Sequence, residues 1–152
     1  MRSMFDGCSG LTALDVSGFH TANVTNMWGM FHRCSGLAAL DVSGFHTANV
    51  TDMGWMFRDC AGLTALDVSA FDTANVTDME VLFSGCLNLK TICASERFAT
   101  EQLGWLGSRD IFWDCSSLVG GNGTVWSAEH IVKDYAHIDG GPSNPGYFTA
   151  KT

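Results

Sequence analysis

Residues 4–29 read MFDGCSGLTALDVSGFHTANVTNMWG, residues 30–55 read MFHRCSGLAALDVSGFHTANVTDMGW, and residues 56–81 read MFRDCAGLTALDVSAFDTANVTDMEV. The three stretches are equal in length, follow one another directly and align without a gap. A fixed period of about 20–50 residues is typical of repeat proteins, in which each unit buries its apolar side only against its neighbours. The spacing therefore predicts a solenoid, and it directs the search for function to long surfaces rather than to enclosed pockets.

Each repeat contains one segment with strand periodicity and one with helix periodicity. In residues 63–69, Leu66 and Val68 alternate with Asp67 and Ser69, which indicates a strand with one buried face. In residues 50–60, apolar side chains recur at spacings of three and four, which indicates one or two turns of helix. We therefore expect an α/β repeat solenoid, with a parallel β-sheet on one side and short helices on the other.

The repeats end in an irregular C-terminal part. We assign residues 1–110 to the repeat solenoid, with units 4–29, 30–55 and 56–81 and a degenerate unit 82–110, and residues 111–152 to a capping unit. Atypical terminal units close the core of a repeat array. We expect a small antiparallel hairpin around residues 121–123, and we interpret Trp113 and Trp126 as core of the cap rather than as ligand contacts.

The N-terminal end shows no comparable closure. Met1 aligns with Met27, so the chain begins within a repeat. An open end exposes strand edge and apolar surface, which favours association. Two expectations follow: this chain is the C-terminal piece of a longer array, or it self-associates through its uncapped N-terminal end.

Six cysteines punctuate the chain, and four of them follow the period. Cys8, Cys34, Cys60 and Cys86 recur once in each repeat at the same interval, and we interpret them as free, buried thiols in one column. Cys93 and Cys115 break the period; they could pair with each other or stay free. No cysteine or histidine pair has the spacing of a zinc site, and we expect no metal and no cofactor.

The triplet Asn-Val-Thr recurs at Asn23, Asn49 and Asn75. It matches the acceptor sequence for N-glycosylation. Its strict recurrence instead favours a ladder of buried amides that hydrogen-bond the backbone from one repeat to the next.

The repeat resembles a known family. The pattern Leu-x-x-Leu-Asp-Val-Ser-x-Phe-x-Thr-x-Asn-Val-Thr-x-Met-x-x-Met-Phe-x-x-Cys is similar to the repeat of the BspA-like leucine-rich-repeat bacterial surface proteins, and the match covers residues 1–93. Residues 116–124, 135–141 and 145–148 resemble the ends of such arrays. The resemblance implies a leucine-rich-repeat-like fold and a secreted or cell-surface protein that acts in adhesion. His20 and His46 depart from the family pattern, which more often has Asp there, as at Asp72.

Comparison of the repeats with one another suggests a first binding surface. Side chains vary on the outward side of the expected helices, where Trp and Arg, both enriched in binding hot spots, accumulate. The candidate residues are Trp28, His32, Arg33, Trp55 and Arg58. The alternative is that one tryptophan covers its neighbour and only shields the stack.

A second candidate surface is the exposed face of the expected sheet, where Asp15, Asp41 and Asp67 stack. A cation or a basic ligand would relieve their repulsion. We favour the alternative, in which these carboxylates bond neighbouring Ser and Thr hydroxyls in a solvated sheet. His20, His46 and Asp72 also align, but two histidines on separate turns more often cap backbone than hold a metal.

Charge and motifs exclude several functions. Acidic residues outnumber basic ones by nine to four in residues 1–93 and by seven to four in residues 94–152, so no basic stripe marks nucleic acid or an anionic membrane as a partner. No apolar run is long enough to insert into a membrane. Since no nucleophile motif or phosphate loop is present, we expect no enzyme activity. We expect an extracellular or cell-surface binding module for a protein or glycan ligand, or alternatively a passive spacer of a larger surface protein.

Overall fold

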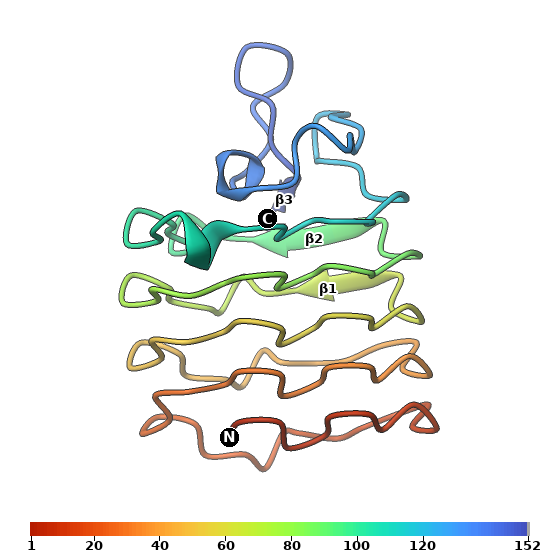
Figure 1. Cartoon of the computed structure of the whole chain (residues 1–152), viewed down its shortest axis with the longest axis vertical. Coiled ribbons are helices and arrows are strands. Elements are labelled where there is room, and N and C mark those ends of the chain that lie inside the picture. Colours follow the sequence, from red (N-terminus) through yellow and green to blue (C-terminus); the bar gives the residue numbers. More distant parts are fainter. Residues whose placement is uncertain (152) are drawn as a thin grey trace.

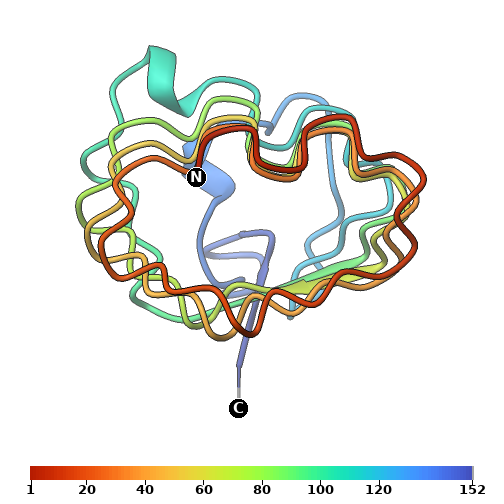
Figure 2. The same cartoon turned by 90° about the horizontal axis from the view of Figure 1, so that it is seen from below.

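The computed structural model describes residues 1–151. Figure 1 shows the chain winding upward in flattened coils that lie one above another, and Figure 2 shows their outlines superimposed when viewed along the stack. We name residues 4–29 coil 1, residues 30–55 coil 2, residues 56–81 coil 3 and residues 82–110 coil 4. The same backbone hydrogen bonds recur between successive coils: the Phe31 N–H donates to the Met56 carbonyl at 2.9 Å, and the equivalent Phe57 N–H donates to the Leu82 carbonyl at 3.0 Å.

The predicted α/β repeat solenoid of leucine-rich-repeat type is wrong. Residues 1–151 contain no α-helix, and their only regular elements are three short strands and two single 3₁₀ turns. The strands are β1 (Ala65–Asp67), β2 (Thr91–Ala94) and β3 (Phe148–Ala150), and the 3₁₀ turns are η1 (Leu106–Ser108) and η2 (Lys133–Tyr135). Most of the chain is turn and irregular backbone, so there is no helical layer opposite the sheet.

The segment expected to be helical is a run of tight turns. The Met56 N–H donates to the Met53 carbonyl, and the Cys60 N–H to the Phe57 carbonyl, both at 3.2 Å. The third residues of these turns, Trp55 and Asp59, have positive φ of 62° and 58°, as in type II turns. Their N–H groups donate to the next coil instead of to residue i−4. Apolar residues spaced by three suit both structures, and contact between coils selects the turns.

The sheet is open, parallel and only three-stranded, in the order β1-β2-β3. Leu66 of β1 lies opposite Ile92 of β2, which lies opposite Phe148 of β3. Leu66 and Val68 are buried, as their alternation predicted. The equivalent residues 11–17 and 37–43 are not strands, so the predicted sheet along all repeats is wrong for coils 1 and 2.

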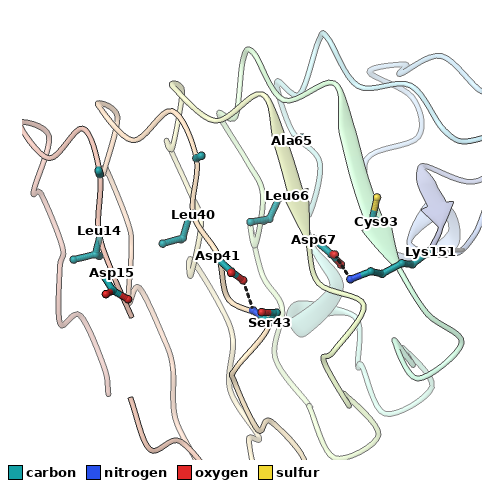
Figure 3. A pocket seen from close by; sticks show the side chains of 12 residues that line it. Leu14, Asp15, Leu40, Asp41, Ser43, Ala65, Leu66, Asp67, Cys93 and Lys151 are labelled. Atoms are coloured by element: carbon teal, nitrogen blue, oxygen red, sulfur yellow. Dashed lines mark hydrogen bonds and ion pairs between the residues drawn. The ribbon is translucent and has the colours of Figure 1, made fainter. Parts of the chain in front are cut away.

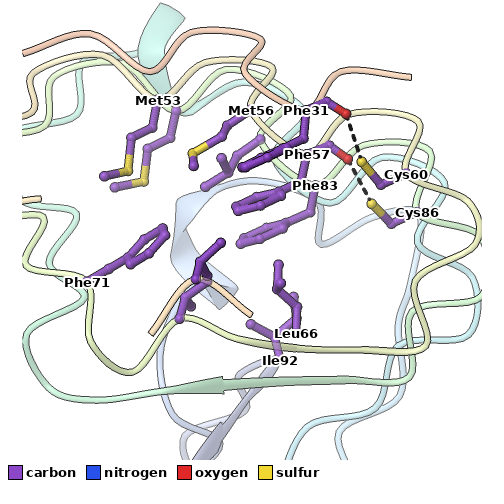
Figure 4. Packing of buried hydrophobic residues seen from close by; sticks show 14 of the residues in the cluster. Phe31, Met53, Met56, Phe57, Cys60, Leu66, Phe71, Phe83, Cys86 and Ile92 are labelled. Carbon is purple, nitrogen blue, oxygen red and sulfur yellow. Dashed lines mark hydrogen bonds between the residues drawn. The ribbon is translucent and has the colours of Figure 1, made fainter. Parts of the chain in front are cut away.

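A column of phenylalanines forms the centre of the core. Successive rings of Phe5, Phe31, Phe57, Phe83 and Phe112 stack with centroids 5.7–5.8 Å apart. Figure 4 shows part of this column, with Met53 and Met56 on one side and Leu66 and Ile92 on the other. Because each ring covers the next, the apolar surface of one coil is removed from water only when its neighbours are in place.

All six cysteines are free thiols, and all but Cys93, which lies in β2, form a second column beside the rings. The thiols of Cys34, Cys60, Cys86 and Cys115 donate to phenylalanine carbonyls of the preceding coil at 3.0–3.2 Å. Figure 4 shows these bonds for Cys60 and Cys86. Burial raises the pKa of Cys34 to about 11 and that of Cys115 to about 12. Cys8 is only half-buried. Cys115 continues the column although it breaks the regular period, and it does not pair with Cys93.

The C-terminal residues cover the upper end of the core. The buried Tyr147 and Phe148 rings meet the Phe112 ring edge-on, with centroids 5.1 and 6.0 Å away. The expected hairpin is reduced to one antiparallel bridge between Val119 and Val125. Within residues 1–151, no helix has the length and hydropathy to cross a membrane.

One buried carboxylate organises this C-terminal part. Asp139, only 1% exposed, accepts hydrogen bonds from the backbone of Asn122, Thr124 and Gly141 at 2.9–3.0 Å and from the Thr124 hydroxyl at 2.8 Å. Burial alone would raise the pKa of Asp139, but these hydrogen bonds outweigh it and hold the pKa well below its ordinary value. The charged carboxylate thus ties three turns together.

Candidate functional site

The turn side of the stack carries the side chains that differ between coils; we call it the turn face. Its backbone is constant, because positive φ recurs at Gly29, Trp55 and Val81 and again at Arg33 and Asp59. Val81 and Ser84 of this face are buried, and its other residues are exposed or half-buried. The residues of the turn face are Arg2, Trp28, Arg33, Trp55, Arg58, Glu80, Val81, Ser84, Arg109, Asp110 and Trp113. The chain therefore presents different chemistry on one repeated scaffold.

The two tryptophans predicted to bind a ligand contact each other. The Trp28 and Trp55 ring centroids are 5.4 Å apart, and both side chains are half-buried. Guanidinium groups lie over both rings, Arg2 over Trp28 at 4.7 Å and Arg58 over Trp55 at 4.1 Å. These cation–π and ring contacts satisfy the two indoles within the protein, as expected if one tryptophan shields its neighbour.

His32, another predicted contact, is 4% exposed and lies under this surface. Its Nδ1 is 2.8 Å from an Asp6 carboxylate oxygen and its Nε2 is 3.7 Å from one of Asp59, but neither nitrogen makes a well-aligned hydrogen bond. The ring also meets the Trp55 ring edge-on at 5.2 Å. Arg33, in contrast, points into solvent, with its Nε 4.0 Å from Asp59.

The two most exposed tryptophans, Trp113 and Trp105, were not predicted to bind a ligand. Trp113 is 54% exposed, so its assignment to the core of the cap is wrong. Trp126 is half-buried, and its indole N–H donates to the Phe112 carbonyl at 2.8 Å. Trp105 is 79% exposed beside η1, the turn that projects from coil 4 (Figures 1 and 2). The greater length of coil 4 could have indicated that the segment around Trp105 projects from the stack, because the three regular coils are shorter.

A groove of about 320 Å³ opens on the turn face beside Trp113. We call it the Trp113 groove; its lining is Trp55, Arg58, Glu80, Val81, Ser84, Arg109, Asp110 and Trp113. Arg109 forms an ion pair with Glu80, and its Nε lies 3.9 Å from an Asp110 oxygen. Two arginines and two acids balance in charge, so the groove offers both hydrogen-bond donors and acceptors around an exposed aromatic ring.

The sheet side of the stack carries a larger, shallow groove of about 740 Å³ (Figure 3). The groove is open where small side chains line it, at Ala13, Ala39 and Ala65. The predicted aspartate column also lines it, at Asp15, Asp41 and Asp67. This column does form, since its members occupy equivalent places in successive coils (Figure 3).

Each aspartate of this column already has partners. Each carboxylate of this column accepts a hydrogen bond at 2.9 Å from the backbone N–H of the serine two residues later in the chain. The sequence had predicted bonds to serine and threonine hydroxyls instead. The three acceptors are Asp15, Asp41 and Asp67. Hydrogen bonds to Ser17 and Ser43 lower the pKa of Asp15 and Asp41. For Asp67, burial opposes the shift, but Lys151 Nζ at 2.6 Å and Ser69 together lower the pKa (Figure 3). Local bonds thus account for the constancy of these acids.

The remaining columns bind backbone. Asn49 and Asn75 donate to the Ala22 and Ala48 carbonyls of the preceding coil at 2.8 and 2.9 Å, so the predicted ladder exists, although its amides are exposed rather than buried. Thr47, which sequence reasoning missed, is buried and both donates to and accepts from the Asp72 backbone.

The aligned histidines lie beside this threonine column. The backbone N–H of His46, not its ring, donates to the Thr21 hydroxyl, and the Asp72 carboxylate lies 3.4 Å from Arg97. Among residues 1–151, no cluster of three His, Cys, Asp or Glu side chains is arranged to hold a metal ion.

Comparison with known proteins places the chain in a family. The family model described as "Mycoplasma protein of unknown function, DUF285" matches residues 1–118. Searches of the curated proteins and of the solved structures found no match. Because the matched residues make up well over half of the 152-residue chain, the protein belongs to the DUF285 family.

Proposed function

We propose that this protein is a cell-surface binding or adhesion module that presents its turn face to a protein or glycan ligand outside the cell. Membership of the DUF285 family is compatible with a surface repeat protein. The finer resemblance to BspA-like leucine-rich-repeat proteins supports an extracellular or cell-surface location and a role in adhesion, although the coils themselves are built from turns rather than helices.

The observation that carries the proposal is the contrast between inward and outward positions of the same turns. Core side chains and inter-coil hydrogen bonds recur from coil to coil, whereas the turn-face pairs Trp28-Gly29, Gly54-Trp55 and Glu80-Val81 differ. Stacking does not require this variation, and it concentrates Trp and Arg, the residue types that dominate binding hot spots. A surface that varies on a constant scaffold suits recognition.

Binding of the full chain to a panel of host cells, bacterial cells, matrix proteins and glycans tests the proposal. Trp28→Ala with Trp55→Ala and Arg58→Ala alters the turn face, while Asp15→Ala with Asp41→Ala alters the sheet side as the matched control. We expect the first variant to lose binding and the second to retain it, with circular dichroism verifying the fold of each. Loss only in the control would move the binding surface to the sheet side.

A passive spacer is the alternative function. Continuous columns of backbone bonds and stacked rings favour a stiff rod, which would separate another domain from a surface. Absence of binding by the unmodified chain across the whole panel would favour this function over the first.

Self-association through the first coil belongs to the same proposal. Met4 is half-exposed at the N-terminal end, and Phe5, the first ring of the phenylalanine column, is half-buried, whereas Phe31 and the later rings of the column are buried. Light scattering at increasing concentration tests this contact: a rise in mass that Met4→Ser abolishes is the expected result, and a constant monomer mass would contradict it.

A further inference from the structure

The Trp113 groove exists because a small side chain stands between two large ones. The outward column that contains Arg58 and Trp113 has Ser84 in the intervening coil. Neighbouring coils are one ring spacing apart, 5.8 Å from Phe57 to Phe83 and 5.8 Å from Phe83 to Phe112. The two large side chains are therefore separated by two coil steps, with Ser84 at the bottom of the gap.

The aromatic wall of this groove is free to receive a ligand. Among residues 1–151, the Trp113 ring has no stacking partner and no cation over it, whereas Trp55 on the opposite wall is engaged by Trp28, His32 and Arg58. A half-exposed indole keeps a large apolar face in water, and a ligand that covers it gains the free energy of that burial.

The polar groups of the groove match a ligand that both donates and accepts hydrogen bonds. Arg58 and Arg109 offer only donors, and the carboxylates of Glu80 and Asp110 only acceptors. The pair formed by Arg109 and Glu80 is solvent-exposed, so its internal bond contributes little and exchanges readily for bonds to a ligand. The charges of the lining side chains cancel, and Asp59 lies 3.4 Å from Arg58 Nε, so no excess of positive charge favours an anionic ligand.

We infer that the Trp113 groove binds a neutral glycan, with the C–H face of one sugar ring on the Trp113 indole and its hydroxyls bonded to Glu80 and Arg109. Vicinal hydroxyls donate and accept at once, which fits an acid beside an arginine, and a sugar ring has an apolar face that fits an indole. The inference rests on the proposed function and narrows its ligand class. The groove is shallow, so the affinity of one site is modest and several linked copies would bind more tightly.

The test is binding of the full chain to an array of neutral oligosaccharides built from hexose and N-acetylhexosamine units, with sulfated and sialylated counterparts alongside. Trp113→Ala removes the aromatic wall. Ser84→His fills the groove with the residue type that coil 2 carries at the equivalent position, His32, so the fold has a precedent for it. Trp105→Ala is the matched control, because Trp105 is exposed but does not line the groove.

We expect neutral glycans to bind better than charged ones, and we expect both groove variants to raise Kd about tenfold or more while Trp105→Ala leaves it unchanged. Glycan binding that survives in Ser84→His, or that is lost equally in Trp105→Ala, would overturn the inference. If the chain binds proteins or cells but no glycan, the inference fails and the proposed function stands. If it binds nothing on either panel, both fail.

Discussion

The turn face and the sheet side are built on the same coils, yet their outward residues behave differently. On the sheet side, coils 1–3 all carry Asp at the equivalent position, and each of these aspartates closes its own turn by accepting the serine N–H two residues on. On the turn face, Trp28, Gly54 and Glu80 are equivalent in position, and only their backbone N–H groups are used alike, each donating to the side chain two residues earlier. On these two surfaces, constancy between coils therefore reports a side chain that the backbone uses, while variation marks positions where the backbone requires no particular side chain. The latter are the better candidates for recognition.

The largest expected effect on stability comes from the phenylalanine column, which lies in the core between the turn face and the sheet side. Phe57→Ala opens a gap in the phenylalanine column between Phe31 and Phe83, and we expect it to lower the free energy of unfolding by about 3–5 kcal/mol. Trp105→Ala, which removes an exposed ring of similar size, should change it by less than about 0.5 kcal/mol. Urea denaturation of the two variants measures the contrast, and equal losses would show that the column is not the core of the stack.

The next effect concerns the C-terminal part, where the buried Asp139 carboxylate, rather than stacked repeats, holds the turns together. Asp139→Asn puts an amide among N–H donors, and we expect a loss of about 1–3 kcal/mol. The pKa of Asp139 is lowered in the folded protein, so its contribution is complete above the ordinary value of 3.8 and is lost as the pH falls through the folded pKa. Thermal unfolding between about pH 2 and pH 7 should show a shallower acid limb for the variant; identical limbs would assign acid unfolding to other groups.

A smaller effect, of opposite sign, tests the scaffold of the turn face. Arg33 adopts a φ of 59°, where coils 1 and 4 have Gly7 and Gly85. Arg33→Gly should stabilise the protein by about 0.5–1 kcal/mol, because glycine adopts this conformation without steric cost. Arg33→Ala is the control, since it removes the same side chain but keeps the Cβ, and it should bring no gain. Denaturation midpoints of the pair decide whether backbone strain or the arginine itself sets the stability.

The smallest effect sharpens the description of the sheet side. Lys151→Ala breaks the ion pair with Asp67, and because both side chains are exposed we expect a marginal loss of stability that salt reduces further. NMR titration should show the Asp67 pKa rising while that of Asp15, which is lowered by Ser17 alone, stays the same. A large loss of stability would instead make the C-terminal strand β3 dependent on this one contact.

Comparison of sequence and structure explains which inferences succeeded. The buried column of Cys34, Cys60 and Cys86 and the inward Leu66 and Val68 could be predicted, because a repeated apolar position must face the repeated neighbour. The helix over residues 50–60 could not be separated from a run of turns. Both place apolar residues three apart, and only the hydrogen bonds from the third residue of each turn to the next coil distinguish them.

The candidate site divides in the same way. Variation between repeats located Arg33 at an exposed position, but His32, Val81 and Ser84, which were expected to face away from the core, are buried. It also did not reveal that Trp28 and Trp55 contact each other. The exposure of Trp113 was missed because the interval between Ser84 and Trp113 is longer than one regular repeat. The comparison of regular repeats therefore did not place Trp113 in the column that contains Ser84.

By itself, the amino-acid sequence determined the period of the repeats, and with it which side chains lie above which, because equivalent positions of identical units must meet when the units stack. Only the tertiary structure decided the backbone of each unit and the partners of its outward side chains. Those depend on whether an N–H finds its acceptor within its own coil or in the next one, and on the size of the residue that the neighbouring coil places alongside.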